Sequence, residues 1–220
     1  NNLQHSKDEN KRILSLLVLK EVANNSPTHF YQHIQSFQDS ILEPLRDRQI
    51  LIRQAAGEAL SACLVLMQQR ENQKKNDFYY TFLTLIQELP KDGRNESIHG
   101  YLIAINSFLN NSMEFCGSSI DSIYSTIQSY FNTKEVYIKI TIIRLIPVIT
   151  RYMSIYADSF LTDEYRMEVF DYLMSCCHRD TYRREALKAI GELAMVLPDD
   201  AYNRLDSICA VVKENLNPKK

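Results

Sequence analysis

His178, Arg179 and Asp180 spell a tripeptide that occurs in the catalytic loop of protein kinases. In that loop the aspartate acts as catalytic base, a leucine follows it, and an asparagine stands five residues further on. Here Thr181 follows the aspartate, Glu185 takes the place of the asparagine, and the sequence contains no Asp-Phe-Gly and no glycine-rich loop. We therefore interpret the tripeptide as a chance match, with Asp180 as the N-cap of a helix that begins near Thr181.

Cysteine and histidine residues supply no complete metal site. Cys176, Cys177 and His178 are adjacent, but tetrahedral zinc requires four ligands, and no second Cys/His pair lies within a plausible span. His29 and His33 stand four residues apart without the glutamate that a zinc protease needs after its first histidine. The cysteine spacing matches no disulfide framework and predicts a reducing, cytosolic setting. We predict no catalytic residue, no metal and no cofactor in this chain.

A column of basic residues recurs along the chain, and an acid often precedes the base. An acid at one turn can bond the base of the adjacent repeat and fix the stacking of repeats. The alternative is that the bases form a stripe which holds an acidic partner. We favour the ladder because the acids recur beside the bases, although partly exposed pairs contribute only about 0–1 kcal/mol each. The predicted ladder comprises Asp8, Arg12, Asp47, Arg53, Asp92, His99, Lys139, Asp180 and Arg183.

Helices must position these residues, because helical periodicity is the strongest pattern in the sequence. The stretch 52–67 is apolar at gaps of three and four residues, which predicts one buried face of an α-helix. Those positions are Ile52, Ala56, Ala59, Leu60, Cys63 and Met67. The same template fits stretches that begin at residues 138 and 182, and it fits a stretch that begins at residue 98 with one polar exception, Asn106. A weaker copy begins at residue 11 and keeps only Val18, Leu19 and Val22.

Other amphipathic helices lie between these copies, so that A and B helices alternate with a period of about 40–46 residues. Two predicted A helices are Thr28–Arg46 and Asp199–Asn215. A period of roughly 40–47 residues with two helices per repeat is typical of HEAT arrays. We predict an all-α, right-handed α-solenoid of four to five HEAT repeats, formed by antiparallel helix pairs. The predicted repeats of this single segment, 1–220, are 1–26 (partial), 27–72, 77–113, 118–157, 160–197 and 199–220 (partial).

Composition excludes several other classes. The chain has 5 glycines and 6 prolines in 220 residues, which leaves few residues for tight hairpins or phosphate-cradling loops. This scarcity argues against all-β, Rossmann and P-loop folds. Gly57, Gly100 and Gly191 fall inside B helices, where we expect close approach of a neighbouring helix. A net charge of -2 predicts no nucleic-acid partner, and no helix has the basic amphipathic pattern of direct membrane insertion.

Several tyrosines have side chains that suit either an interface or a core. Tyrosine is enriched in protein interfaces, so these residues could anchor a partner. On helices of period 3.6 we favour packing between the A and B layers for most of them. They are Tyr79, Tyr80, Tyr101, Tyr152 and Tyr156.

One stretch, Leu16 to Glu71, resembles the N-terminal HEAT-repeat region of the TOR (target of rapamycin) Ser/Thr kinases. It begins with LLVLKEVA, similar to the LVLKELA helix of that family, and an aromatic-rich helix follows. A basic-residue helix then ends in Ala-Cys-Leu at 62–64 and in Gln-Arg-Glu at 69–71. The similarity continues in order along nearly the whole chain, at Ser97–Leu102, Leu145–Ile149 and Ala189–Ala194.

The resemblance implies a non-catalytic scaffold that supports TOR complex assembly in nutrient and growth signalling. The implied partners are a Raptor-type or Rictor-type subunit and a second copy of the parent kinase, whose active site would lie outside these residues. The implied location is the cytoplasm, with peripheral association with the lysosomal or vacuolar membrane through the parent complex. The alternative is a HEAT-repeat adaptor of another class, such as a phosphatase scaffold or a nuclear transport receptor.

Overall fold

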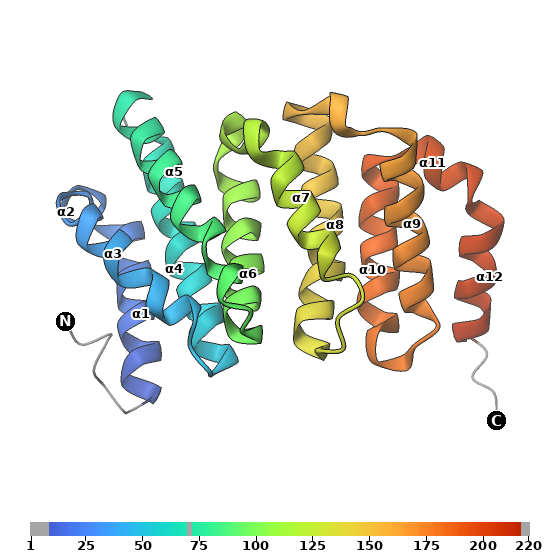
Figure 1. Ribbon diagram of the computed structural model, residues 1–220, viewed down its shortest axis with the longest axis horizontal. Coiled ribbons are helices and arrows are strands. Elements are labelled where there is room, and N and C mark those ends of the chain that lie inside the picture. Colours follow the sequence, from blue (N-terminus) through green and yellow to red (C-terminus); the bar gives the residue numbers. More distant parts are fainter. Residues whose placement is uncertain (1–8, 70–71, 217–220) are drawn as a thin grey trace. The chain divides into compact units, whose positions relative to one another are not determined.

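The computed structural model describes residues 9–69 and 72–216. Within these ranges the chain forms α-helices joined by short turns and 3-10 helices, and it forms no β-strand (Figure 1). The chain divides into two compact units, Asn1–Ser118 (unit 1) and Ser119–Lys220 (unit 2). The predicted class, an all-α solenoid, is confirmed. The repeat boundaries stay a prediction.

Unit 1 is organised around α4, which packs between α1 and α6 (Figure 1). All six apolar positions of its predicted stripe are buried. This helix is long and apolar enough to cross a membrane, but 61% of that window is buried inside the protein, as in the central helix of a helical stack. The elements of unit 1 are α1 (Glu9–Asn25), α2 (Pro27–Gln32), α3 (Ile34–Leu45), α4 (Ile50–Gln68), α5 (Asn72–Gln87), η1 (Leu89–Asp92), α6 (Asn95–Asn111) and most of η2 (Met113–Ser119).

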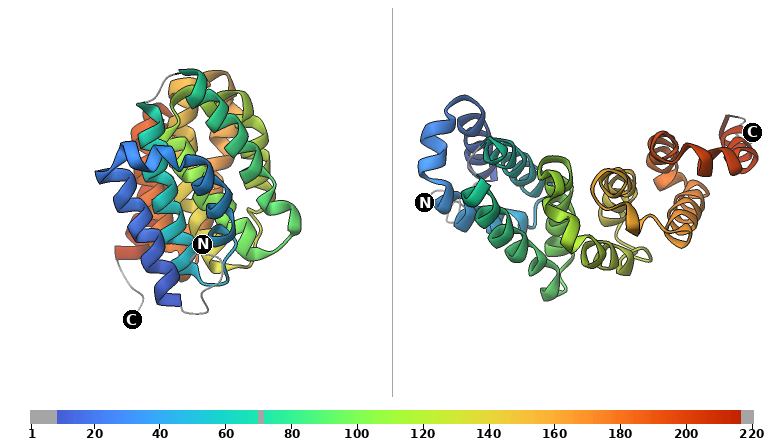
Figure 2. Two further views of the ribbon diagram at one scale, coloured as in Figure 1. Left: turned by 90° about the vertical axis from the view of Figure 1, so that its left-hand side faces the viewer. Right: turned by 90° about the horizontal axis from the view of Figure 1, so that it is seen from above.

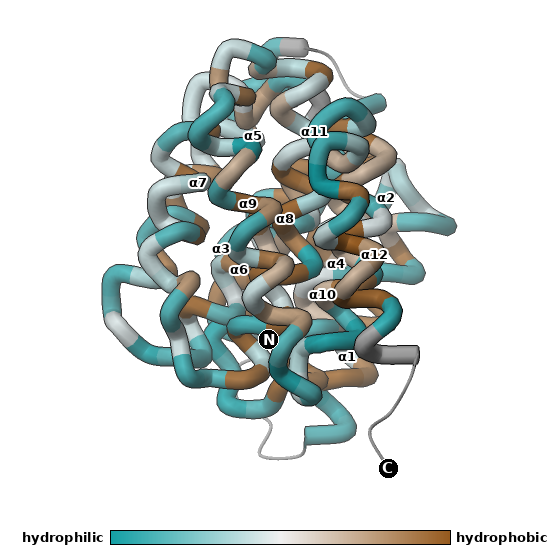
Figure 3. The backbone as a smooth tube through the Cα atoms, turned by 90° about the vertical axis from the view of Figure 1, so that its right-hand side faces the viewer, coloured by the Kyte–Doolittle hydropathy of each residue, from teal (hydrophilic) through white to brown (hydrophobic). Residues whose placement is uncertain are grey.

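In unit 2, α10 packs against both α8 and α9. Helices are seen nearly end-on in the right-hand view of Figure 2. Apolar and hydrophilic segments alternate along them in Figure 3, as the helical periodicity requires. The elements of unit 2 are α7 (Ile120–Ser129), α8 (Val136–Tyr156), η3 (Asp158–Phe160), α9 (Asp163–Cys177), α10 (Asp180–Val196), α11 (Pro198–Asn203) and α12 (Leu205–Leu216).

Two predicted A helices are each divided by a break of one residue. The predicted helix Thr28–Arg46 is divided at His33 into α2 and α3, and the predicted helix Asp199–Asn215 is divided at Arg204 into α11 and α12. At both breaks the backbone N–H donates to the carbonyl three residues earlier, so each short helix ends in a tight 3-10 turn. Both short helices begin with a proline, whose missing N–H costs nothing in the first turn.

The prediction of which face of α1 is buried, made from the weak copy of the template, is wrong. Val18, one of its three matched positions, is 51% exposed, whereas Leu16 and Ala23 are the buried residues of this helix. Since α1 is apolar at many adjacent positions, its sequence alone does not distinguish the face that packs on α4. The copies in α4, α8 and α10 have every template position buried.

Glycines allow close packing at two of the three predicted positions. A Cβ atom at Gly57 would lie 2.2 Å from Ile103 Cγ2 of α6, and one at Gly100 would lie 1.9 Å from the carbonyl oxygen of Leu45. Real Cβ atoms do not approach so closely, so both predictions are confirmed. The prediction for Gly191 is wrong, because a Cβ atom there meets no atom within 4 Å.

Candidate functional site

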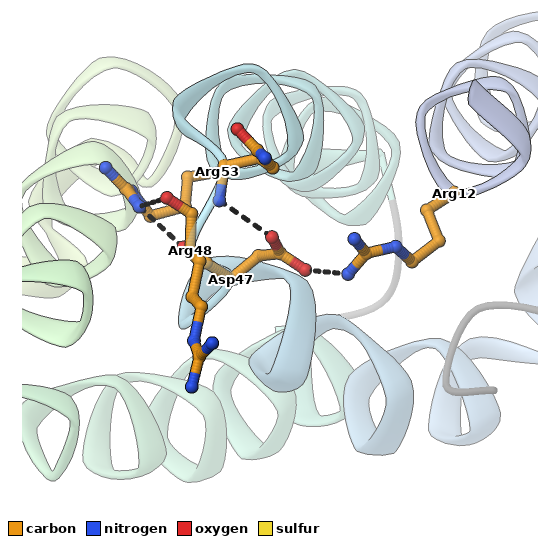
Figure 4. A network of polar contacts seen from close by, with 5 residues as sticks. Arg12, Asp47, Arg48 and Arg53 are labelled. Atoms are coloured by element: carbon orange, nitrogen blue, oxygen red, sulfur yellow. Dashed lines mark hydrogen bonds and ion pairs between the residues drawn. The ribbon is translucent and has the colours of Figure 1, made fainter. Parts of the chain in front are cut away.

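Arg53 is the most deeply buried member of the predicted ladder, with 1% of the residue exposed. It lies in the first turn of α4. Its Nη1 donates to the backbone carbonyls of Asp47 at 2.5 Å and Arg48 at 3.1 Å (Figure 4). These carbonyls follow the C-terminus of α3, where unpaired acceptors and the negative end of the helix dipole favour a cation. Arg53 therefore joins the end of α3 to the start of α4.

The same guanidinium reaches the next B helix through His99. Arg53 Nε donates to Nδ1 of His99 at 2.8 Å, and His99 is 3% exposed on α6. Burial, followed by the nearby charge of Arg53, lowers the pKa of His99 from 6.5 to about 4. The imidazole is therefore neutral at pH 7 and can accept this hydrogen bond.

Asp47 connects unit 1 in the opposite direction, toward α1. Its carboxylate forms an ion pair with Arg12 of α1 (Figure 4), and both side chains are largely shielded from solvent. The other carboxylate oxygen accepts a hydrogen bond from the backbone N–H of Gln49 at 2.8 Å. Gln49 is the N-cap residue of α4, so one aspartate both starts α4 and binds the preceding B helix.

Asp92, in the turn before α6, binds the start of that helix as Asp47 binds the start of α4. Asp92 accepts a hydrogen bond from the backbone N–H of Arg94, the N-cap residue of α6, at 2.9 Å. It also accepts one from Ser97 Oγ at 2.7 Å. Burial raises the pKa of the Asp92 carboxyl, but these hydrogen bonds outweigh burial and lower it. At the entry to α8 the acceptor is a hydroxyl, Thr133 Oγ1, which receives the N–H of Glu135 at 3.3 Å.

The two basic members in unit 2 also bind carbonyls at the end of the preceding helix. Lys139 donates to the carbonyl of Phe131 at 3.1 Å, and Arg183 Nε donates to that of Cys177, the last residue of α9, at 3.1 Å. Lys139 also lies over the rings of Tyr172 and Tyr182, with Nζ 5.5 and 5.6 Å from their centroids. A cation in this position connects α8 to both helices of the following pair.

The structure thus brings together some predicted ladder residues and separates others. Arg12 of α1 meets Asp47 in the turn before α4, and Arg53 of α4 meets His99 of α6. Asp180 pairs with Arg183 within one helix, Asp92 bonds within its own turn, and Asp8 lies outside the described residues. The role of the column in stacking remains a prediction. The sequence did not indicate that Arg53, Lys139 and Arg183 each donate to a main-chain carbonyl. Every residue has such a carbonyl, so no residue type marks the acceptor.

The kinase-like tripeptide lies at the junction of α9 and α10. His178 is the C-cap residue of α9, Arg179 is the N-cap residue of α10, and Asp180 is its first helical residue. The prediction that Asp180 is the N-cap is therefore wrong by one position. Its carboxylate instead binds Arg183 Nη1 at 2.5 Å, as expected of an acid in the first turn.

The cysteines lie where apolar side chains pack. Cys63, Cys116, Cys176 and Cys177 are buried, and Cys209 is exposed. Burial raises the pKa of Cys116 and of Cys177 to about 11, which keeps both thiols protonated at neutral pH. Within residues 9–69 and 72–216 no group of three or more His, Cys, Asp or Glu side chains is arranged to hold a metal ion.

The tyrosines divide between the core and the surface. Tyr79, Tyr101 and Tyr152 are at most 2% exposed and fill space between helices, as predicted for most of the set. Tyr80 and Tyr156 are 73% and 42% exposed and lie at the surface.

Two solved structures of engineered proteins share this fold, and one of them is a repeat protein. A designed armadillo repeat protein superposes with a TM-score of 0.55 and 13% identity, covering 98% of this chain and 90% of that one. An engineered protein superposes with a TM-score of 0.56 and 15% identity, covering 100% of this chain and 89% of that one. Stacked helix pairs of this kind are a feature of repeat-solenoid proteins.

Sequence relatives give the family resemblance. No protein-family model matches the chain. The serine/threonine-protein kinases TOR of Arabidopsis thaliana and of Oryza sativa subsp. japonica are 29% and 30% identical over 213 residues, which is 96% of this chain. The serine/threonine-protein kinase tor1 of Schizosaccharomyces pombe is 27% identical over 99% of it. The chain is therefore similar, along almost its whole length, to one segment of TOR kinases, and the predicted resemblance is confirmed. It spans only 8–9% of the length of these relatives.

Proposed function

We propose that this chain is a non-catalytic scaffold segment of the N-terminal solenoid of a TOR kinase. The observation that carries the proposal is the similarity itself, which covers 96% of the chain but only 8% of the Arabidopsis and rice kinases. A repeat-solenoid fold supports it, because stacked helices present extended surfaces to other proteins. The parent protein would be a Ser/Thr kinase whose active site lies outside these 220 residues.

In this proposal the segment acts by presenting its surface to other subunits of the parent complex. It supports homodimerisation of the parent kinase and docks a large accessory subunit of the Raptor or Rictor type. Its location is cytoplasmic, with peripheral contact with the lysosomal or vacuolar membrane through the parent complex. The buried hydrogen bond between Arg53 and His99 supports this role because it connects successive B helices.

Cross-linking mass spectrometry on the intact parent complex tests the proposal. Lys91 and Lys188 have exposed side chains and offer one reactive amine in each unit. We expect cross-links from these lysines to a Raptor-type or Rictor-type subunit, or to a second copy of the kinase. Cross-links between other subunits of the complex serve as the control that the complex is intact.

A contradictory result would be abundant cross-links elsewhere in the complex and none between this segment and another subunit. Binding of the isolated chain to a small GTPase of the nuclear transport type would instead favour the adaptor class. Phosphate transfer by the isolated 220 residues would overturn the non-catalytic assignment.

A further inference from the structure

Unit 2 contains a groove between α7, η3 and α9 that the scaffold role does not explain. Its volume is about 360 Å³, at the lower end of the roughly 300–1,000 Å³ found for ligand-binding cavities. Buried Met153 and Tyr165 form part of its lining, and Phe160, which is 37% exposed, contributes an accessible aromatic ring. The groove therefore has apolar and aromatic surface available to a side chain that enters it.

Among the residues that the structure describes, three carboxylates and no basic side chain line this groove. Asp121 comes from α7, and Glu164 and Glu168 come from α9. Asp121 and Glu164 are exposed, and among the residues that the structure describes neither forms an ion pair. Arg166, the cation of α9, is paired instead with Asp163 and Asp200. The lining of the groove is therefore acidic, with three carboxyl side chains.

Glu168 is held in a fixed orientation by donors from the neighbouring helix. Tyr124 OH donates to its Oε2 at 2.5 Å, and Gln128 Nε2 donates to its Oε1 at 2.6 Å. A carboxylate has about four acceptor positions, so two remain for a further donor. The ring of Tyr124 also packs edge-on against that of Tyr165, with centroids 4.8 Å apart, which fixes the wall of the groove.

We propose that this groove binds an arginine-containing segment of a partner protein. A guanidinium combines the three properties that the groove complements: it is cationic, it donates to carboxylates in a planar fork, and it stacks on aromatic rings. Glu168 and Glu164 accept its hydrogen bonds, Asp121 adds attraction, and Phe160 provides a ring for stacking. This inference does not depend on which parent protein contains the chain.

Fluorescence anisotropy with a labelled eight-residue peptide of alternating arginine and glycine tests the inference on the 220-residue chain. We expect saturable binding that weakens with added salt. The double variant Asp121→Asn/Glu164→Gln should raise the Kd about tenfold, as expected for the loss of two partly exposed charge contacts. Phe160→Ala should also weaken binding, and a peptide with lysine in place of arginine should bind less tightly.

The matched control is Asp199→Asn/Asp206→Asn, which removes two exposed first-turn carboxylates of α11 and α12 and changes the net charge equally. This control should bind within twofold of the wild type, and thermal melts should show that both variants fold. Equal loss of binding in both double variants would indicate general charge attraction and overturn the proposal. An unchanged Kd in the groove variant, or no saturable binding by the wild type, would also overturn it.

Discussion

Arg53 differs from the other basic residues of the column in how completely it is removed from water. Its guanidinium has acceptors on α6 and in the turn after α3, so a single side chain connects α4 to both. A buried cation is tolerated only where hydrogen bonds replace its hydration. The sequence predicts that the column fixes repeat stacking through ion pairs, but Arg53 donates hydrogen bonds to neutral acceptors, namely an imidazole and two carbonyls.

We predict that Arg53→Ala lowers the free energy of unfolding by about 3 kcal/mol, because it leaves a cavity and removes the buried hydrogen bonds of the guanidinium. The control is Arg144→Ala, which removes an exposed arginine that pairs with Glu185 at 2.8 Å and should cost less than about 1 kcal/mol. Urea denaturation followed by circular dichroism measures both. Equal losses of unfolding free energy in the two variants would show that the buried contacts of Arg53 stabilise the protein no more than an exposed ion pair does.

His99 should make stability depend on pH. Its pKa is about 4 in the folded protein and near 6.5 when unfolded, so only the unfolded chain gains a proton between these values. The stabilisation is therefore complete above pH 6.5 and is lost as the pH falls toward 4. We expect wild type to lose about 1–3 kcal/mol more than His99→Gln between pH 7 and pH 4.5, since glutamine accepts from Arg53 without titrating. Parallel denaturation curves for the two proteins would contradict this assignment.

At the scale of the helices, glycine marks where two elements come close. Gly100→Ala places a Cβ atom 1.9 Å from the backbone oxygen of Leu45, so the end of α3 must move. We expect a loss of at least about 2 kcal/mol. Gly191→Ala is the matched control in α10, where no atom lies within 4 Å, and it should stabilise by about 0.5–1 kcal/mol through helix propensity. Thermal melting of both variants distinguishes packing from propensity.

The existence and buried faces of most helices follow from the sequence because a period of 3.6 residues records burial directly. Three other features of the structure could not be predicted from the sequence. The helix breaks at His33 and Arg204 contain neither proline nor glycine, so the residue types do not predict them. The helix α1 is apolar at so many positions that its sequence does not show which face is buried. Residue spacing indicated the recurrence of Arg53, Lys139 and Arg183, but their carbonyl acceptors become visible only when the turns are folded.

At the scale of the whole molecule, a destabilising substitution should affect mainly the helices near it, because each helix pair packs only on its neighbours. We predict that Gly100→Ala speeds amide hydrogen exchange in α3, α4 and α6 and leaves α9, α10 and α12 unchanged. Hydrogen exchange with mass spectrometry on the 220-residue chain measures this directly. Faster exchange throughout unit 2 would show instead that the chain unfolds as one cooperative body.

The turns that start α4 and α6 also affect how fast the protein folds. Asp47 and Asp92 each fix the entry to a B helix by accepting an N–H only two residues away, so the connection forms with almost no loop to close. Contacts of such short sequence separation are associated with fast folding. Each helix pair should therefore be able to form soon after its second helix leaves the ribosome, without waiting for the remainder of the chain.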